Sequence, residues 1–597
     1  MKKGIKIWGV ILLAISLLVS GCQINKEKKL KADIDKLLLD MTLEEKVGQM
    51  LQVERADVKL EEFSRYYIGS VLSGGGSTPA KDTTDVAAWL KMINDFQTAA
   101  SKTPHHIPII YGIDAIHGHN NLASATIFPH NIGLGSANDA ELMKKIGAVT
   151  AKEMRATGIT WTFAPCMPVA KDPRWGRFYE SYGDNVELTA KLSSALIEGL
   201  QANGVAACAK HYIGDGLTKW GTGMNDKIDR GNVELSEEEI RATVLPVYKE
   251  AIEKGVKTIM VSYSSLDGVK MHENKYWITD VLKEELGFEG FVVSDYEAIH
   301  ELKDKNLYQQ VVAATNAGVD MFMEPKVWRE VYAALLKAVD NGDITEDRIT
   351  DAARRIIRVK FEMGLFEKAI PQVEAGYTIG SKENREIAKE AVRKSLVLLK
   401  NKQDILPLKK DSKFYVVGPA ADDIGVQCGG WTVSWQGGEK MTQGTSILQG
   451  LKEVAGDHII TDKAKANEAD VVILIIGEEP YAEYNGDNST LALDGVSGLN
   501  GNLEAVQRAK ALGKPIVTVM VAGRPMIVTE QINAWDAFVM AWLPGSEGRG
   551  IAEMLFGEPY DFTGRLTVDW PKSSENLPIK NADDILFEKG YGLNNKK

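Results

Sequence analysis

Residues 290–296 read Gly-Phe-Val-Val-Ser-Asp-Tyr, a short apolar run that ends in a carboxylate and an aromatic ring. The run at 291–294 predicts a buried β-strand, because β-branched and aromatic residues bounded by a glycine are typical of strands. Asp295 then stands at the carboxyl end of the strand, where it would either cap the next helix or act in catalysis. The fold class depends on whether similar strands precede and follow this one.

The same rhythm extends from residue 48 to residue 323, where short apolar runs alternate with helix-like stretches. Such alternation favours parallel strands joined by crossover helices. Eight candidate strands lie at residues 50–53, 68–72, 107–112, 160–164, 205–209, 258–263, 291–294 and 319–323. Eight strands over this length predict a closed (β/α)8 barrel within residues 23–368, and an open doubly wound sheet is the alternative for the same pattern.

A second α/β unit is predicted after the barrel. Residues 346–366 have the pattern of a helix, and residues 369–384 are assigned to a linker because Pro371 and Gly376 interrupt any clear period. Further on, a helix is expected at 385–399 and at 503–512, and strands at 414–417, 471–476, 515–521 and 537–541. Residues 385–597 are too few for eight more βα units, so a doubly wound α/β sandwich is expected there.

The composition is that of an ordinary globular protein, with 44 % hydrophobic and 25 % charged residues. Because 70 basic and 82 acidic residues leave a net charge of -12, nucleic acid is a poor partner. The scattered Cys166, Cys208 and Cys428 predict no disulfide framework. Without any Cys or His spacing typical of zinc, neither a metal nor another cofactor is expected.

Residues 1–22 have the pattern of an export signal. Three lysines precede an apolar run at 7–19, which is short for a bilayer crossing of about 20 residues. Small residues before Cys22 resemble a bacterial lipoprotein box, whereas the alternative is a plain secretory peptide cleaved near Gly21. The sequence therefore predicts export and a lipid anchor on Cys22 in a bacterial membrane, with residues 23–29 as a polar tether and no other membrane contact.

Polar side chains also follow other candidate strands of the barrel. Blocks at residues 112–118, 172–181 and 210–215 each carry several hydrogen-bonding groups. The carboxyl ends of barrel strands meet at one face, where barrel enzymes have their active sites. A polyol substrate needs such a lining, because a buried hydroxyl left unpaired costs free energy. Within these blocks Arg177 either binds a ligand or pairs with a neighbouring acid, and the first is favoured.

Together these blocks resemble the family 3 glycoside hydrolases, above all the two-domain exo-acting β-glucosidases and β-glucan exohydrolases. The likeness extends from Leu-Glu-Glu-Lys-Val-Gly-Gln-Met at residues 43–50 to Phe-Glu-Lys-Gly-Tyr-Gly at residues 587–592. It implies a barrel followed by an α/β sandwich. It also implies a retaining exo-β-glucosidase that releases glucose from the non-reducing end of β-glucans or β-gluco-oligosaccharides through a covalent glycosyl-enzyme.

The resemblance assigns two catalytic acids. Asp295 corresponds to the nucleophile in the family's Ser-Asp-aromatic block, and Glu483 to the acid/base that the second domain contributes. Within residues 477–487, Glu478 and Glu479 are less favoured for that role. Retaining enzymes hold the two carboxyl groups about 5–5.5 Å apart. Asp295 must be ionised, which nearby cations favour, whereas Glu483 must start protonated, which burial by the ligand favours.

The resemblance also assigns the substrate-binding side chains. The ring at the cleaved end corresponds to Asp114, Arg177, Lys210, His211 and Tyr263, and the aromatic clamp around the next sugar to Tyr296 and Trp435. Tyr296 stands where the exohydrolases carry a tryptophan, which leaves the preference for the second sugar open.

Three alternatives remain open. A β-xylosidase of the same family differs in its substrate by one hydroxymethyl group. A β-N-acetylglucosaminidase of the family draws its acid/base from a Lys-His-Phe-Pro-Gly-His block, whereas residues 210–215 here have neither the proline nor the second histidine. An oligosaccharide-binding lipoprotein without activity would also need export and stacking tryptophans. A monomer or a homodimer is expected.

Overall fold

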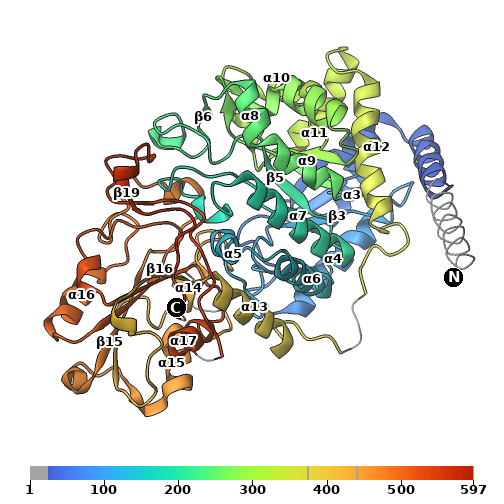
Figure 1. Cartoon of the computed structure of the whole chain (residues 1–597). Helices are drawn as coiled ribbons and strands as arrows, with labels where there is room; N and C mark the ends of the chain where they lie inside the picture. Colours follow the sequence, from blue (N-terminus) through green and yellow to red (C-terminus); the bar gives the residue numbers. More distant parts are fainter. Residues whose placement is uncertain (1–24, 373–375, 439–441, 558, 596–597) are drawn as a thin grey trace, which may run out of the picture.

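The computed structural model describes residues 25–372, 376–438, 442–557 and 559–595. Two domains lie side by side, a helix-rich barrel and a smaller α/β domain, which Figure 1 colours dark yellow to red. Cys22 and the predicted export signal lie outside the described residues. Among the described residues, none of the helices combines the length and the apolar character that a membrane crossing needs.

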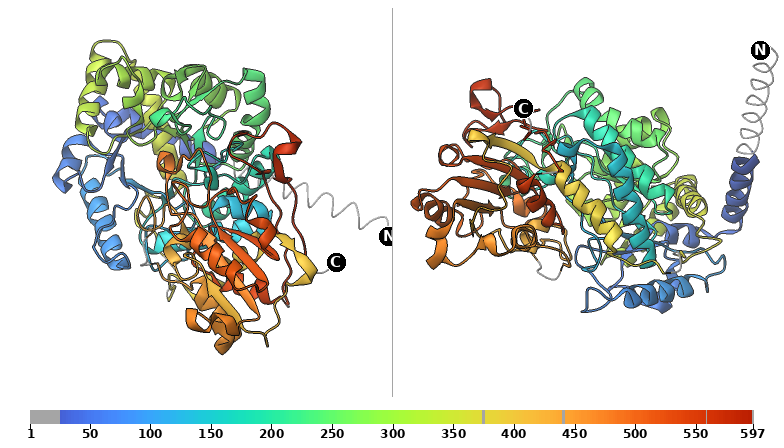
Figure 2. Two further views of the ribbon diagram at one scale, coloured as in Figure 1. Left: turned by 90° about the vertical axis from the view of Figure 1, so that its left-hand side faces the viewer. Right: turned by 60° about the horizontal axis from the view of Figure 1, so that its bottom comes forward.

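The first described segment is a helix at residues 25–40, so the polar segment expected at 23–29 is helical from residue 25. Ile34 and Leu38 are buried in a cluster with Ala353 and Ile357 of α12 (Glu346–Glu362). This helix therefore packs on the barrel, on the side remote from the second domain (Figure 2).

The eight predicted barrel strands are all present. They are β1 (Leu51–Glu54), β2 (Ser70–Ser73), β3 (Ile110–Ile113), β4 (Trp161–Thr162), β5 (Cys208–Tyr212), β7 (Thr258–Val261), β10 (Phe291–Val293) and β11 (Phe322–Met323). They form parallel sheets in the orders β11-β1-β2-β3-β4 and β10-β7-β5. Parallel bridges from Trp161 to Ala206 and from Val293 to Met321 join the two sheets. The closed barrel is confirmed, and the open sheet is excluded.

Helices surround the barrel strands (Figure 1). The longer ones are α4 (Val86–Ala100), α6 (Ala140–Ala156), α7 (Val186–Ala202), α9 (Leu245–Glu253), the π-helix at Tyr276–Glu285, α10 (Leu307–Ala317), α11 (Trp328–Asp340) and α12. Their first turns follow local sequence signals. Asp139 caps α6 and Asn185 caps α7, because a short side-chain oxygen accepts a free N–H of the first turn. Caps of this kind fix where the loop before each of these two helices ends.

The second domain contains one six-stranded sheet. Its strands are β12 (Val397–Asn401), β13 (Phe414–Val417), β14 (Ile459–Ile460), β15 (Val471–Gly477), β16 (Ile516–Val521) and β17 (Ala537–Trp542). Their order is β12-β17-β16-β15-β13-β14, and every pair is parallel except β12 with β17. Helices α13 (Lys382–Ser395), α15 (Ile447–Ala455), α16 (Asn502–Ala511) and α17 (Arg549–Phe556) alternate with the strands. The predicted doubly wound α/β sandwich is confirmed.

The helix predicted at 385–399 is wrong over its last residues. Helix α13 begins at Lys382, inside the segment assigned to the linker, and ends at Ser395. The following residues form the edge strand β12, which pairs with β17. A continuous apolar run such as Leu396-Val-Leu-Leu399 has no period, so it fits a buried strand as well as a buried helix turn. The pairing with β17 shows that these residues form a strand and not a helix turn.

Candidate active site

A cavity of about 710 Å³ opens at the carboxyl ends of the barrel strands and is walled on one side by the second domain. Its lining includes all nine predicted substrate-binding and catalytic residues, namely Asp114, Arg177, Lys210, His211, Tyr263, Asp295, Tyr296, Trp435 and Glu483. The structure therefore brings together every predicted site residue that lies within the described ranges. The position is the one at which barrel enzymes carry their active sites.

Asp295 stands two residues after the end of β10 and is held by hydrogen bonds with His272 and Tyr296. Its N–H donates to Nε2 of His272 over 3.1 Å, and its Oδ1 accepts the N–H of Tyr296 over 2.7 Å. Oδ2 lies 3.4 Å from Nε2 of His211 and has no hydrogen-bond partner among the described residues. This leaves one carboxylate oxygen free to attack an electrophile in the cavity.

Two effects of opposite sign act on the protonation of Asp295. Burial raises the pKa of its carboxyl, and the charge of Glu483 adds to this effect. His211, Arg177 and Lys210 lower the pKa of the same carboxyl. The two cations expected to favour the carboxylate, Arg177 and Lys210, act in that direction, but burial outweighs them and the pKa of Asp295 is raised.

The floor of the cavity is made of buried ion pairs. Nζ of Lys210 lies 2.6 Å from Oδ1 of Asp114, and the Arg177 guanidinium makes two hydrogen bonds, of 3.0 and 2.8 Å, to Glu180. Trp431 donates its indole N–H to the same carboxylate over 3.0 Å. Burial alone would raise the pKa of Glu180, but Arg177 and Lys210 lower it to about 2. The floor thus presents fixed charges that can bind sugar hydroxyls.

The two alternatives for Arg177, lining a ligand site and pairing with a neighbouring acid, are therefore both realised, since it lines the cavity and pairs with Glu180. His211 is oriented in a similar way. Its Nδ1 lies 2.5 Å from Oδ2 of Asp215, which turns Nε2 toward Asp295. Glu180 and Asp215 both stand in the quoted blocks. Pairing of Arg177 with a neighbouring acid is one of the alternatives that the sequence offers, whereas nothing in the sequence indicates that Asp215 orients His211.

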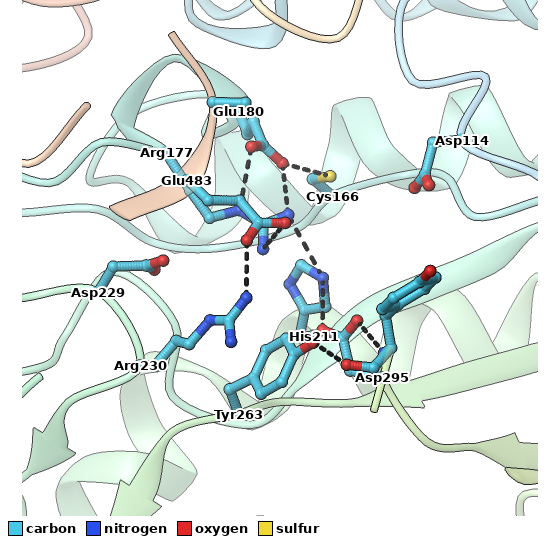
Figure 3. Close-up of polar contacts among 12 residues, drawn as sticks. Asp114, Cys166, Arg177, Glu180, His211, Asp229, Arg230, Tyr263, Asp295 and Glu483 are labelled. Atoms are coloured by element: carbon cyan, nitrogen blue, oxygen red, sulfur yellow. Dashed lines mark hydrogen bonds and ion pairs between the residues drawn. The ribbon is translucent and has the colours of Figure 1, made fainter. Parts of the chain in front are cut away.

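Glu483 reaches the cavity from the second domain, at the start of a short 3-10 helix (Glu483–Gly486). Figure 3 shows its carboxylate between two guanidinium groups. Nη2 of Arg230 lies 2.8 Å from Oε2 and Nη1 of Arg177 lies 4.0 Å from Oε1. The sequence did not indicate Arg230 as a partner of this carboxylate. Arg230 lies in a loop remote from any predicted strand end, so no local pattern marked it.

Arg230 is part of a wider polar network at the cavity wall. Its Nη1 lies 3.0 Å from Glu301, whose other oxygen lies 2.7 Å from Nζ of Lys270. Its guanidinium carbon lies 3.7 Å from the ring centre of Tyr263, and the Tyr263 hydroxyl donates to the carbonyl oxygen of Tyr296. Tyr263 thus supports both the arginine and the segment that follows Asp295.

The aromatic clamp predicted at the cavity mouth is built on a glycine loop after β2. A Cβ atom at Gly75 would lie 2.9 Å from Cβ of Trp435, and one at Gly74 would lie 3.3 Å from Cε2 of Tyr296. Glycine is therefore required for Trp435 to come this close, and it leaves room for Tyr296. The ring of Tyr484, which the sequence analysis did not single out, lies 5.9 Å from that of Trp435. Three aromatic rings thus line the entrance.

Asp229 is a buried carboxyl near the site that the sequence analysis also missed. Its Oδ1 accepts the indole N–H of Trp175 over 2.8 Å, whereas its Oδ2 has no hydrogen-bond partner among the described residues. Burial raises the pKa of Asp229 to about 8; Arg177 lowers it, and Asp487 and Glu483 raise it. The folded protein therefore carries a proton here at neutral pH.

This proton makes stability depend on pH. An unfolded aspartate has a pKa of about 3.9, so between about pH 4 and pH 8 the folded state binds one proton more and its free energy of unfolding falls as pH rises. Asp229→Asn abolishes this proton uptake and keeps the acceptor for Trp175. We expect the stability of the variant relative to the wild type to rise steadily between pH 4 and pH 8, by up to about 1.4 kcal/mol per pH unit. Thermal unfolding across this range measures the difference, and a constant difference would contradict the assignment.

Two family models match the chain. Residues 42–359 match the glycosyl hydrolase family 3 N terminal domain, and residues 396–595 match the glycosyl hydrolase family 3 C-terminal domain. Each match covers one of the two domains described above.

Similar proteins agree with these matches. The chain is 33% identical to the lysosomal beta glucosidase of Dictyostelium discoideum, over 94% of this chain and 75% of that protein. It is 40% identical, with a TM-score of 0.88, to the crystal structure of an exo-1,3/1,4-beta-glucanase from a Pseudoalteromonas species, over 95% of this chain and 74% of that one. A mutant beta-glucosidase from Listeria innocua, solved in complex with laminaribiose, is 26% identical, with a TM-score of 0.81 and coverage of 94% and 83%. The chain belongs to glycosyl hydrolase family 3.

Proposed function

We propose that this protein is a retaining exo-β-glucosidase, with Asp295 as the nucleophile and Glu483 as the acid/base. The observation that carries the proposal is the meeting of these two carboxyl groups, one from each domain, in one cavity floored by charged side chains. The similarity to a β-glucosidase and to an exo-1,3/1,4-beta-glucanase supports glucose as the sugar at the cleaved end.

In the first step Oδ2 of Asp295 attacks the anomeric carbon, and the bond from that carbon to the leaving oxygen breaks. Glu483 gives its proton to the leaving oxygen, so the departing sugar leaves as a neutral alcohol. Because Nη2 of Arg230 lies 2.8 Å from Oε2 of Glu483, this step requires that the bound substrate weakens the contact between them.

In the second step water attacks the anomeric carbon of the glycosyl-enzyme, and the bond to Asp295 breaks. Glu483 now takes a proton from the water, which only its carboxylate form can do. The Arg230 and Arg177 guanidinium groups around Glu483 suit this step. Two displacements at the same carbon return the configuration of the substrate.

The floor of the cavity supports exo action. Lys210 and Arg177 are almost fully buried, and with Asp114 they can satisfy the hydroxyls of one terminal ring. Because these buried charges already have ion-pair partners, they can form a hydrogen bond with a sugar hydroxyl and leave no buried charge unpaired. A glucan chain would then extend outward past Trp435 and Tyr296.

The test is a product time course on β-1,3- and β-1,4-linked glucose oligomers, with the anomers followed by NMR. We expect glucose to be released one unit at a time and first as the β-anomer. Initial α-glucose would contradict retention, and shortened oligomers without free glucose would contradict exo action. Rates on aryl glucoside and aryl xyloside separate a β-xylosidase, and absence of hydrolysis would indicate a binding protein.

Trp435 allows a separate prediction for the second sugar. We expect Trp435→Ala to raise KM for a disaccharide roughly 10-fold, because a sugar face loses the aromatic surface on which it stacks. The kcat value should change less, since Trp435 touches neither catalytic carboxyl. Steady-state kinetics measure both, with Tyr484→Phe as the control that keeps a ring. Equal KM values for Trp435→Ala and wild type would exclude stacking at this position.

We also propose that the protein is exported and anchored through acylated Cys22. The lipoprotein-like segment before Cys22 supports this. Cell fractionation of the wild type and of Cys22→Ser is the test, and we expect only the wild type in the membrane fraction. A monomer and a homodimer both fit the proposal.

A further inference from the structure

The loop that carries Glu483 is fastened to the barrel by a second acid, Asp487, four residues further on. Oδ1 of Asp487 accepts the backbone N–H of Gly176 over 2.7 Å. Oδ2 accepts the N–H groups of Ile228 and Asp229 over 3.2 and 2.9 Å. One buried carboxylate of the second domain thus joins two separate loops of the first.

The two loops held in this way carry the two cations around Glu483. Gly176 precedes Arg177 and Asp229 precedes Arg230 in the chain. The guanidinium groups of these two arginines lie 4.0 and 2.8 Å from the Glu483 carboxylate. Asp487 and Glu483 stand in the same loop. Asp487 therefore fixes the backbone next to both arginines relative to Glu483.

A buried arginine reinforces the same junction. Nη2 of Arg524 donates to the carbonyl of Gly486 over 2.7 Å, and its Nε donates to Glu478 over 2.9 Å. Its Nη1 donates to the carbonyl of Pro173 over 3.2 Å, so one guanidinium touches the acid loop and the loop before Gly176. Arg524 is fully buried. Bonds with one charged partner, shielded from water, are stronger than neutral ones.

The two domains also touch at Glu483 itself. A Cβ atom placed on Gly176 would lie 1.9 Å from the carbonyl oxygen of Glu483. The backbone of the barrel loop therefore lies directly against the backbone of the acid, and only glycine allows this approach.

We infer that Asp487 is a positioning residue for acid/base catalysis, which holds Glu483 in register with Arg177 and Arg230 across the domain interface. The inference rests on the proposed role of Glu483. Asp487 is not among the residues that line the cavity, so it acts through the residues that it holds. Its loss should therefore affect the steps that need Glu483 much more strongly than the attack by Asp295.

The test is Asp487→Asn in the full chain. The asparagine keeps one acceptor oxygen, but its NH₂ group replaces the other and faces backbone N–H donors. The hydrogen bonds to one of the two barrel loops are therefore lost. For a disaccharide, whose leaving group needs a proton, we expect kcat/KM to fall about 100-fold, since general acid catalysis contributes roughly 10²–10⁴-fold. For 2,4-dinitrophenyl β-glucoside, whose leaving group needs none, kcat/KM should stay within about threefold of wild type. Added azide should restore kcat on this substrate, because it needs no general base.

The ratio of the two kcat/KM values decides the question. Both values come from one preparation, so their ratio does not depend on the fraction that is folded. A merely structural role of Asp487 would lower both values together and leave the ratio unchanged, and that outcome overturns the inference. Asp462→Asn is the matched control, because Asp462 also accepts a backbone N–H in the second domain and should leave the ratio at the wild-type value.

Two further variants separate this inference from the proposed function. Gly176→Ala pushes on the Glu483 backbone from the barrel side, so it should change the same ratio in the same direction. Glu483→Gln must show the same leaving-group pattern if Glu483 is the acid/base. If Glu483→Gln lacks the pattern, the proposed function fails; if it shows the pattern and Asp487→Asn does not, only the positioning role fails.

Discussion

Asp295→Asn is expected to lower kcat/KM for every β-glucoside by roughly 10,000-fold or more, since loss of a covalent nucleophile removes the whole double-displacement route. The amide cannot attack the anomeric carbon, and it supplies no negative charge to an oxocarbenium-like transition state. An activated leaving group should not rescue this variant, because the missing group acts on the sugar and not on the departing oxygen.

The variant should still fold and bind sugar. The N–H of residue 295 would still donate to His272, and the amide oxygen can replace the carboxylate oxygen that accepts the Tyr296 N–H. Calorimetry with glucose or a glucose oligomer measures binding independently of turnover. Retained binding without hydrolysis supports the nucleophile, whereas activity near the wild-type level would exclude Asp295 from that role.

The same residue can be identified directly. In a 2-deoxy-2-fluoro glucoside the fluorine destabilises both transition states, and an activated leaving group speeds only the first step, so the glycosyl-enzyme forms faster than water removes it. Mass spectrometry of peptides from the treated wild type should place the sugar on Asp295. A label on any other residue would contradict the assignment.

The barrel could be predicted because its signals are local. Each strand is a short apolar run, several of them with polar residues close behind, such as β10 with Asp295 two residues further on, and the eight runs repeat along the chain. The edge strand β12 could not be predicted in this way. Its residues form a continuous apolar run after a helix, and the feature that makes them a strand is the distant partner β17.

Site residues could be predicted where they stand near the end of a predicted strand or in a sequence block that resembles the family. Asp114 follows a barrel strand as predicted, whereas Lys210 and His211, predicted to follow the strand at 205–209, lie within β5. Glu483 is assigned by resemblance, since spacing alone does not separate it from its acidic neighbours. Arg230 carries no comparable signal. It becomes significant through its contact with Glu483, and the backbone beside it is held by Asp487, more than 250 residues away in the chain.

Glu483→Gln gives the second large effect, and its size should depend on the substrate. Glutamine fits the same space but has no proton to give, so kcat/KM for a disaccharide should fall about 1,000-fold, within the range of general acid catalysis. For 2,4-dinitrophenyl β-glucoside the fall in kcat/KM should be small, because dinitrophenolate leaves without protonation. The glycosyl-enzyme should then accumulate, since no base activates water, and kcat should drop while KM drops with it.

Glu483→Ala makes the same group replaceable from solution. Removing the side chain opens space between Arg177 and Arg230, where a small anion can lie. Azide needs no base, so it should restore kcat on the dinitrophenyl substrate and form β-glucosyl azide, whose β-configuration follows from two displacements on Asp295. An α-azide would show that the azide had replaced the nucleophile, and Glu483 would then take the role assigned here to Asp295. Since Glu478 pairs with the buried Arg524 outside the cavity, Glu478→Ala should show no such rescue.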